Sequence, residues 1–574
     1  MKKYDFRILS LLVFVLLGIH FLLANNLQAE TTVSTMPNFI IRFQADLGSL
    51  NRFHSITFSQ TKYETLKGFF NAKREELNNI NFNLLPHSEK VEWILMQNYI
   101  GKELKQLEFE NKQIKNIEQL IPFSSVIIEL FESRMKIEVM DAQKTAEKLN
   151  EIKNQIDIAS ERIRQGMNID RSSANRAVNV INSYRNDLRR WYEFYYSYDP
   201  MFTWWCEQPY KAADTALQSY AGLVREQLVG SRRGDDIVIG DPIGREALIQ
   251  ELRSEMIAHT PEELIAIGEK EYEWCLNEIR KASRELGFGD DWKKAIEYVK
   301  TLHVEPGKQT YLVNELAHEA VEFLELKNLL TIPELAKTTW RMEMMSPERQ
   351  RITPFFTGGE VISVAFPTAE MSHEEKLMSL RANNEHFSRA VVHHELIPGH
   401  HLQQFMNARN NTHRRIFSTP FWGEGWALYW ELLLWDLDFA RSAEDKVGML
   451  YWRMHRCARI VFSLKFHMGM MTPEECVSYL IDKVGHERAS AEGEVRRSFS
   501  GMYSPLYQAA YMIGGLQFYA LHKEIVRSGK MTNKQFHDFI LQQNSIPVEM
   551  VRVLITNQNI SRDFQPGWKF YNQN

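Results

Sequence analysis

The chain has 574 residues and a nearly balanced charge, with 68 Lys and Arg against 73 Asp and Glu. This balance provides no field that would attract nucleic acid or an anionic membrane surface. A hydrophobic fraction of 44% and a charged fraction of 25% are those of a folded globular protein, and the length suffices for one very large domain or several ordinary ones.

The N-terminal segment differs from the rest of the chain. Basic MKKYDFR precedes the apolar run ILSLLVFVLLGIHFLLA, and polar NNLQAE follows, with Ala24 and Ala29 at positions suited to cleavage. This order predicts a secretory signal peptide over residues 1–29, with an uncleaved anchor as the alternative. The first cysteine is Cys206, which excludes lipid attachment through a cysteine in this segment. We therefore expect an exported protein, periplasmic or extracellular, with no stable membrane insertion once the signal is cleaved.

The chain contains only four cysteines and no C-x-x-C pair. A domain of this size does not need a disulfide framework to hold its core. We expect buried free thiols and no thiolate metal ligands; the cysteines are Cys206, Cys275, Cys457 and Cys476.

Helical signals dominate the sequence. Residues 100–190 and 252–282 carry apolar side chains at three- and four-residue spacing. Thr260, Ser372 and Thr472 each stand three residues before a glutamate, the pattern of a capping box at a helix start. These features predict a mainly α protein.

A polar, glycine-rich stretch divides the chain. VGSRRGDDIVIGDPIG, residues 229–244, has the composition of a linker. It predicts an N-terminal helical region over residues 30–235 and a second helical region over residues 236–574.

The clearest strand signal is ITPFFTGGEVISVAFPT, residues 352–368, where a Gly-Gly turn separates two β-prone runs. It predicts a small β-hairpin about twenty residues before a cluster of histidines. An edge strand there could bind an extended peptide through main-chain hydrogen bonds.

Six of the 18 histidines fall between His386 and His413, which indicates a site. Within this window VVHHELIPGHHLQQF, residues 391–405, resembles the zinc signature H-E-x-x-H, but the second histidine comes two residues late. On a straight α-helix, His394 and His400 would be ~120° apart around the axis and ~9 Å along it, too far apart to share one ion.

The two inserted residues provide a way to bring these histidines together. Pro398 has no N–H to donate to the carbonyl of His394, and its ring clashes with that carbonyl, so the helix must bend, widen or break. Gly399 tolerates the backbone angles that such a distortion requires. We expect His394 and His400 to be two metal ligands, with His401 as the alternative second ligand, and we expect His393 to be packed or hydrogen-bonded nearby.

A third ligand is expected from FWGEGWALYWELL, residues 421–433. This stretch predicts a buried aromatic helix, in which Glu424 and Glu431 would be costly unless paired or bound to a metal. The two glutamates share a face but lie ~10 Å apart along it, so only one should reach the ion. We expect Glu424 to be the ligand and Glu431 to lie beside the site; the alternative is that both pair with arginines such as Arg453 or Arg497.

HHELIPGHHLQ followed by GEGWALYWE resembles the bacterial family of domain of unknown function 885, whose members carry H-E-x-x-P-G-H-x-x-Q and then E-G-W-A-x-Y. The resemblance covers roughly residues 240–525, including DPIGREAL and the E-x-x-R at Glu494 and Arg497. The family is grouped with the gluzincin metallopeptidases, in which the downstream glutamate is a zinc ligand, and GEGWALYWE is similar to a helix of thermostable carboxypeptidases and angiotensin-converting-enzyme-like peptidases.

The resemblance implies a large helical metallopeptidase-like fold that holds one Zn²⁺ ion. It implies that His394, His400 and Glu424 are the ligands and that Glu395 is the catalytic base. One departure concerns the aspartate that often follows the glutamate ligand by four residues and orients a histidine, because that position is Leu428 here. If zinc binds, another group must fix the imidazole tautomer.

Further catalytic candidates lie near the C-terminus. A tetrahedral oxyanion needs a donor besides the metal, and MYSPLYQAAYMIGG offers Tyr503, Tyr507 and Tyr511. Tyr511 best matches the Y-x-x-G of the family. Arg497 could bind a substrate carboxylate bidentately, or could instead form a salt bridge with Glu494.

These residues predict an exported zinc-dependent metallopeptidase that hydrolyses peptide substrates, with a metal-activated water as nucleophile and Glu395 as general base. The same ligands would also serve a zinc hydrolase of non-peptide amides or esters. A third alternative is a non-catalytic metal-binding protein, for which a base beside the first ligand would have no use.

Overall fold

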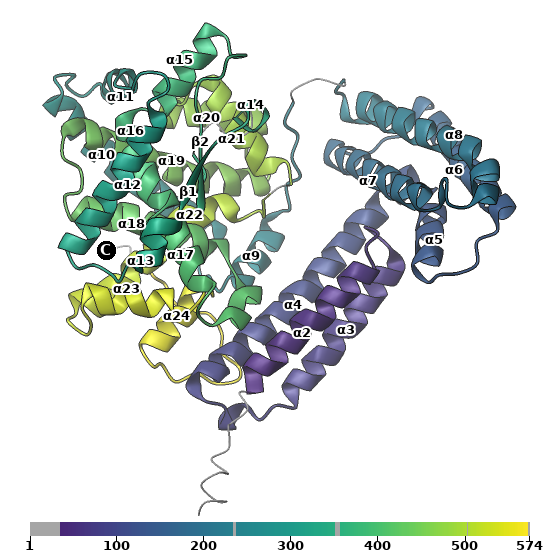
Figure 1. Ribbon diagram of the computed structural model, residues 1–574, viewed down its shortest axis with the longest axis horizontal. Coiled ribbons are helices and arrows are strands. Elements are labelled where there is room, and N and C mark those ends of the chain that lie inside the picture. The colour runs from purple at the N-terminus through teal and green to yellow at the C-terminus, as the bar shows by residue number, and fades with distance from the viewer. Residues whose placement is uncertain (1–34, 233–236, 351–355, 502, 572–574) are drawn as a thin grey trace, which may run out of the picture.

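The computed structural model describes residues 35–232, 237–350, 356–501 and 503–571 (Figure 1). The predicted signal peptide lies outside the described residues. The described chain is mainly helical with one small sheet, which confirms the predicted fold class. None of its helices combines the length and the apolar character needed to cross a membrane.

Three long helices open the described chain. They are α2 (Thr35–Phe53), α3 (Gln60–Asn78) and α4 (His87–Asn116). Apolar side chains such as Phe43, Phe70 and Ile100 are fully buried and belong to the same hydrophobic core as the second half of the chain. A buried ion pair ties them to that half, because Arg414 Nε lies 2.8 Å from Glu92 Oε1.

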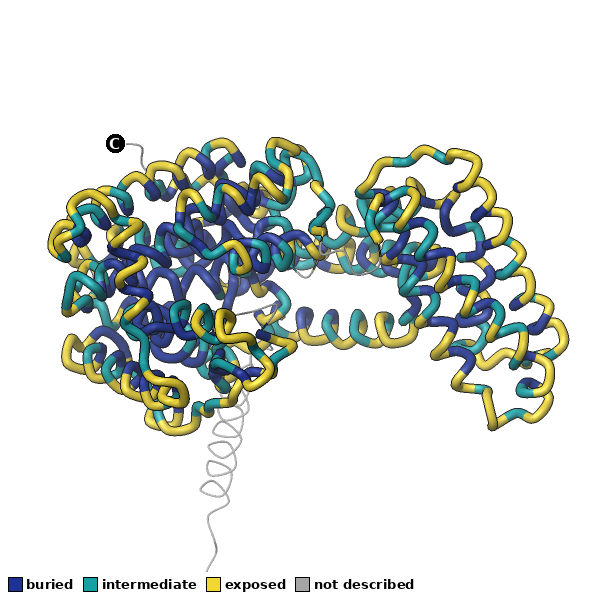
Figure 2. The backbone as a smooth tube through the Cα atoms, turned by 90° about the horizontal axis from the view of Figure 1, so that it is seen from above, coloured by how far each residue is buried: buried dark blue, intermediate teal, exposed yellow. Residues whose placement is uncertain are grey.

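Four further helices form a separate lobe, on the right in Figure 1. They are α5 (Ser124–Met135), α6 (Ala142–Arg164), α7 (Arg171–Tyr195) and α8 (Pro200–Val224), followed by the short π-helical η3 (Arg225–Val229). The lobe has its own hydrophobic core (Figure 2). The expected boundary at residue 235 lies outside the described residues, and the described residues on its two sides, 231–232 and 237–244, form neither helix nor strand. The two hydrophobic cores divide elsewhere, because α2 to α4 pack with the large lobe.

The large lobe contains the remaining helices. They are α9 (Arg245–Ser254), α10 (Pro261–Glu285), α11 (Trp292–Thr301), α12 (Gln309–Leu326), α13 (Glu334–Thr339), α14 (Pro347–Gln350), α15 (His373–Ala382), α16 (Glu385–Glu395), α17 (His400–Asn407), α18 (Pro420–Asp436), α19 (Ala443–His467), α20 (Pro473–Val484), α21 (Arg488–Phe499), α22 (Tyr507–His522), α23 (Asn533–Leu541) and α24 (Val548–Ile555). The predicted capping boxes at Thr260, Ser372 and Thr472 are confirmed.

The interior of this lobe is buried (Figure 2). Helices α18, α19 and α22 are buried along most of their length. Helix α18 carries three fully buried tryptophans, Trp422, Trp426 and Trp430. The rigidity of such a close-packed interior is what allows polar side chains on these helices to be held in fixed positions.

The sheet differs from the predicted hairpin. Strand β1 (Arg341–Met344) pairs in parallel with β2 (Val361–Val364), so the partner of β2 comes from outside residues 352–368. The other edge of β2 is already occupied where Ser363 exchanges hydrogen bonds with Thr357. Residues 351–355 lie outside the described residues. A peptide therefore cannot add to β2 at Ser363 in the way that the hairpin prediction suggested.

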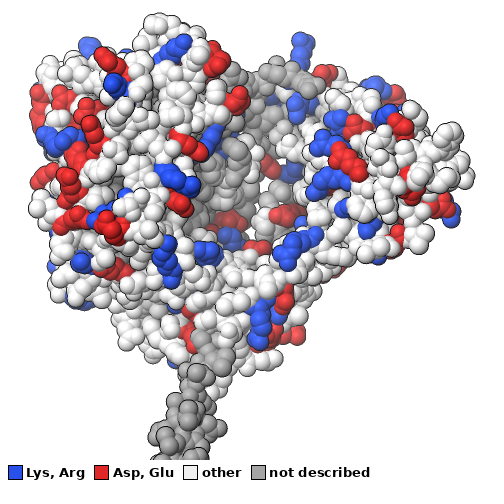
Figure 3. Space-filling model, in the orientation of Figure 1, with Lys and Arg blue, Asp and Glu red and all other residues white. Residues whose placement is uncertain are grey.

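The surface and the thiols agree with the composition. Positive and negative side chains are mixed over the face in Figure 3, and this face is hollowed between the large lobe and the α5–α8 lobe. All four cysteines are free and buried, as expected.

Candidate metal centre

The Pro-Gly insertion breaks the histidine helix in two. Helix α16 ends at Glu395 and α17 begins at His400, and the peptide bond before Pro398 is cis. The indole N–H of Trp426 donates to the Pro398 carbonyl over 2.8 Å, so the buried aromatic helix holds the break in place. The sequence allowed a bend, a widened turn or a break at this point, and the structure shows a break.

Glycine is required at position 399 because the chain folds back onto α16 there. A Cβ atom on Gly399 would overlap the carbonyl oxygen of His394. The Gly399 N–H instead donates to the carbonyl of His393 over 3.0 Å. This close return brings the start of α17 beside the end of α16, which a straight helix could not do.

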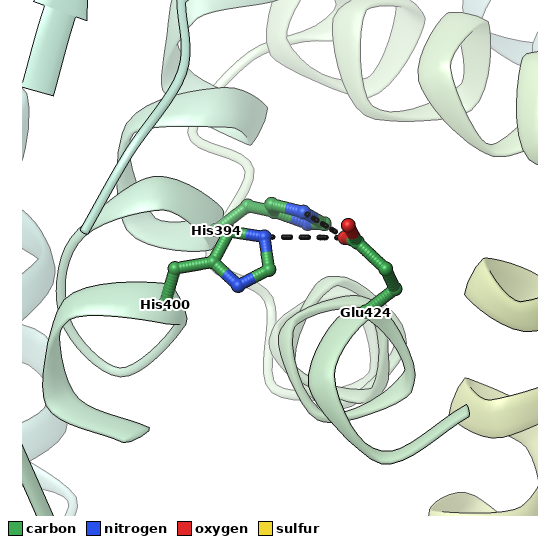
Figure 4. Close-up of side chains that lie close together, drawn as sticks. All are labelled: His394, His400 and Glu424. Atoms are coloured by element: carbon green, nitrogen blue, oxygen red, sulfur yellow. Dashed lines mark ion pairs between the residues drawn. The ribbon is translucent and has the colours of Figure 1, made fainter. Parts of the chain in front are cut away.

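The break brings three ligand-type atoms together (Figure 4). His394 Nε2, His400 Nε2 and one oxygen of Glu424 all lie within 4.8 Å of one another. Glu424 Oε2 is 3.1 Å from His400 Nε2 and 3.6 Å from His394 Nε2. Two ligands bound tetrahedrally to one zinc at ~2.1 Å would be ~3.4 Å apart. The two distances to Glu424 are therefore close to this value, and the three residues predicted from the sequence form a group that could hold a metal ion.

The neighbouring histidines are turned elsewhere. His401 Nε2 lies 2.8 Å from the carbonyl oxygen of Ala336, so the alternative second ligand is not directed at the site. His393 is buried, with its ring edge-on to Phe439, and burial lowers its pKa to about 4.

The carboxylate of Glu424 is buried and only half satisfied. The hydroxyl of Tyr507 donates to Oε1, whereas Oε2 has no hydrogen-bond partner among the described residues and faces the two histidines. Burial would raise the pKa of Glu424, but His400 and His394 hold it well below its usual range. An ionised, unpartnered oxygen beside two imidazoles is the donor set of a metal site.

Glu431 orients the first histidine. Its Oε1 accepts a hydrogen bond from His394 Nδ1 at 2.7 Å and lies 3.6 Å from Arg456 Nη2. Burial would lower the pKa of His394, but the carboxylates of Glu424 and Glu431 raise it to about 9. Glu431 thus fills the orienting role for which the sequence left no aspartate at position 428, and it keeps the Nε2 atom of His394 directed at the site.

Gln403 supports the second histidine. Its amide nitrogen lies 2.8 Å from His400 Nδ1 and donates to the carbonyl of Gly423, also over 2.8 Å. This side chain therefore connects α17 to the residue before the Glu424 ligand.

Helices α18 and α22 pack backbone to backbone, which brings the late tyrosines to the site. A Cβ atom on Gly425 would lie 2.6 Å from the Cα atom of Gly514, so both positions need glycine. The Tyr511 ring stacks on His394 with 6.2 Å between ring centroids and 15° between planes. Burial raises the pKa of Tyr511 to about 12. In the Y-x-x-G motif, Gly514 thus allows the close contact with α18, and this contact places Tyr511 beside His394.

The three ligand candidates open onto a cavity of about 370 Å³. Glu395, at the end of α16, lines it beside the ligands, and the loop before β2 closes one side. This loop fits tightly, because a Cβ atom on Gly358 would overlap Glu395. Beyond the ligand candidates and Glu395, the residues that line the cavity include four arginines, Arg349, Arg456, Arg459 and Arg497, together with Phe356, Thr357, Gln404, Trp452, Tyr503, Tyr507 and Tyr511.

The arginines were only partly anticipated. Arg497 does line the cavity, and its Nε lies 3.6 Å from Glu494 Oε2. Arg453, one suggested partner for the α18 glutamates, pairs instead with Glu271. Arg456 and Arg459 were missed; the signal available was the run of three arginines at three-residue spacing in the largely apolar stretch RMHRCARIVF, residues 453–462.

The fold and the site define a helical protein with a candidate two-histidine, one-glutamate metal centre at the floor of a cavity. The chain belongs to the family described as "Bacterial protein of unknown function (DUF885)", whose model matches residues 46–555. No curated protein matches the sequence.

Two solved structures share the fold. One, from Shewanella oneidensis, is described as "a putative lipoprotein of unknown function"; it has a TM-score of 0.70 and 18% identity over 91% of this chain and 100% of its own. The other, "the putative lipoprotein from Colwellia psychrerythraea", has a TM-score of 0.58 and 14% identity over 91% of this chain and 98% of its own. At these identities the similarity extends to the fold alone.

Proposed function

We propose that this protein is an exported zinc-dependent metallopeptidase. The observation that carries the proposal is the convergence of His394 Nε2, His400 Nε2 and the unpartnered Glu424 Oε2 at a cavity that Glu395 also lines. A catalytic zinc takes three such ligands and leaves a further position open. The neighbouring cavity leaves room for a reacting group.

The residues present fit zinc in particular. Two neutral imidazoles and one carboxylate form a common catalytic zinc set, whereas calcium and magnesium prefer oxygen ligands alone. Glu431, hydrogen-bonded to His394 Nδ1, is the carboxylate partner that metal-bound histidines usually have.

Each residue has a distinct task in peptide hydrolysis. When bound, zinc would supply the Lewis acidity that polarises the scissile carbonyl and makes the attacking water more acidic. Glu395 accepts the proton of that water and donates it to the leaving amine. The Tyr511 hydroxyl, with its pKa raised to about 12, stays protonated near neutral pH and donates to the developing oxyanion.

Export is supported by the N-terminal sequence and by the two similar structures, both described as lipoproteins. Fractionation of cells that produce the full chain tests this point. Protein found in the cytosol with residues 1–29 intact would contradict it.

The metal proposal is tested by elemental analysis of purified protein. We expect about one zinc per chain in the wild type and little in His400→Ala or Glu424→Ala. His401→Ala is the matched control, because that adjacent histidine is hydrogen-bonded to Ala336 and should leave the zinc content unchanged. Loss of zinc in His401→Ala with zinc retained in His400→Ala would show that His401, and not His400, is the second ligand.

The catalytic proposal is tested with a peptide library and with Glu395→Gln. This variant should keep its zinc and lose hydrolysis by at least ~100-fold. Hydrolysis of simple esters or amides without cleavage of any peptide would assign the site to a different hydrolase class. Zinc bound with no hydrolysis of any substrate would leave a metal-binding protein.

A further inference from the structure

One wall of the cavity carries more positive than negative charge. Arg456 and Arg459 from α19 and Arg497 from α21 all line it. Among the described residues, two carboxylates form ion pairs with these three guanidinium groups, Glu431 and Glu494. One positive charge is therefore left over in a largely buried place, where an unpaired charge is costly.

The pairing geometry shows where the surplus lies. Arg459 makes a bidentate pair with Glu494, through Nε at 2.7 Å and Nη2 at 3.0 Å. Arg497 approaches the same carboxylate only to 3.6 Å, and Arg456 approaches Glu431 only to 3.6 Å. Among the described residues, Arg456 Nε, Arg459 Nη1 and Arg497 Nε are buried and have no hydrogen-bond partner.

Aromatic rings hold these guanidinium groups in place. The Tyr511 ring lies 4.8 Å from the Arg456 guanidinium carbon and 4.5 Å from that of Arg459, and the Tyr503 ring lies 5.2 Å from that of Arg497. Such stacking restricts the side chains without using their N–H groups. The three guanidinium groups are thus held at the cavity wall before any anion binds.

The other acids of the cavity have separate engagements. Glu424 is directed at the two histidines and accepts from Tyr507. Glu395 lies at the end of α16 against the loop at Gly358, and no ion pair joins it to these arginines within the described residues. The negative charge of Glu424 acts on Arg497 from a distance, but neither carboxylate forms an ion pair with the three arginines within the described residues.

We propose that this wall, with Arg497 as its principal donor, binds a carboxylate of the peptide substrate next to the scissile bond. The inference rests on the proposed peptidase function and adds its substrate class: short peptides that present a carboxylate, either at the C-terminus or on an acidic side chain. A planar guanidinium suits a carboxylate because two N–H groups bind its two oxygens together.

The test measures peptide binding to zinc-loaded Glu395→Gln protein by calorimetry, so that the ligand is not consumed. Three acetylated tripeptides are compared: one with a free C-terminal carboxylate, its C-terminal amide, and an amide that ends in a glutamate residue. We expect a carboxylate-bearing peptide to bind ~100-fold more tightly than the plain amide. Tight binding of the first peptide identifies the C-terminus, and tight binding of the third identifies an acidic side chain.

Arg497→Met, added to the same protein, should reduce the affinity for that peptide to the affinity for the plain amide, which should itself not change. Arg453→Met is the matched control, since Arg453 is a largely buried arginine of α19 that pairs with Glu271 away from the cavity. Equal binding of all three peptides would overturn the inference, even if Arg497→Met fails to fold.

Failure of the inference and failure of the proposed function give different results. If wild-type protein hydrolyses the free acid and its amide at the same rate, the peptidase function stands and the proposal that the three arginines bind a substrate carboxylate is wrong. If the protein binds the free acid selectively but hydrolyses no peptide, the arginines do bind a carboxylate and the proposed peptidase function is wrong.

Discussion

Replacing Glu431 should weaken zinc binding although this residue is not a ligand. Its Oε1 accepts from His394 Nδ1 at 2.7 Å in a buried setting, which fixes the ring and its tautomer. Loss of such a partner typically costs 10- to 100-fold in metal affinity, or about 1.4–2.7 kcal/mol. Glu431→Gln keeps an acceptor and loses only the charge, so we expect about tenfold; Glu431→Leu removes both, so we expect about 100-fold.

Competition with a zinc-chelating dye measures these affinities. Glu431→Leu should also lower the free energy of unfolding, because it removes the carboxylate that faces Arg456; breaking a buried ion pair costs up to about 3–5 kcal/mol. Glu549→Gln is the matched control, a buried glutamate that accepts from the backbone of Gly567 and Trp568. Unchanged zinc affinity in Glu431→Leu would refute the role assigned to this residue.

Three further predictions concern the ligand cluster. Gly399→Ala should abolish zinc binding, measured by elemental analysis, because its methyl group would overlap the carbonyl of His394. In metal-free protein the pKa of His394 is raised from 6.5 to about 9. The charge of His394 therefore stabilises the fold fully below pH ~6.5, and this stabilisation is lost as the pH rises through about 9. Urea unfolding with a chelator present should show a free energy of unfolding that falls over this pH range. Tyr507→Phe removes a donor to Glu424 and should weaken zinc binding about tenfold, whereas Tyr511→Phe should spare zinc and lower kcat by ~100-fold.

Controls and contrary results separate these predictions. Gly423→Ala places a methyl group beside the ligand helix where its nearest neighbour is 3.8 Å away, so zinc should be retained. Zinc-loaded protein should not lose stability between pH 6.5 and 9, since the metal replaces the proton on His394; the same loss with and without zinc would contradict the assignment. A fall in kcat for Tyr507→Phe with none for Tyr511→Phe would move the oxyanion donor to Tyr507.

The ligands could be predicted because their signals are local. The proline four residues after His394 cannot continue the helix, and the glycine that follows lets the chain fold back onto it. A short stretch of sequence therefore determines how His394 and His400 are brought together. Glu424 stands out because an acid in an apolar aromatic helix needs a partner. Capping boxes are equally local, which is why Thr260, Ser372 and Thr472 were placed correctly.

Features that depend on distant packing were not predicted. Strand β1, residues 341–344, is largely exposed, and its alternation of polar and apolar side chains covers only four residues, which is too short to mark it as the partner of β2. The grouping of α2 to α4 with the large core depends on contacts such as Arg414 with Glu92, 322 positions apart. The roles of Arg459 and Arg456 depend on other helices, because α21 brings Glu494 against Arg459 and α18 brings Glu431 within 3.6 Å of Arg456.

The seven-residue spacing of the two α18 glutamates explains why one histidine needs both of them. Positions seven apart share a helix face but are ~10 Å apart along the axis, so both cannot bind one ion. That separation suits an imidazole placed between them, because its two nitrogens lie on different sides of the ring: His394 Nε2 faces Glu424 and Nδ1 faces Glu431. Leu428, four residues after Glu424, packs on Gly515 of α22 instead. Moving the acid back to that position by Leu428→Asp with Glu431→Leu should therefore not restore zinc affinity.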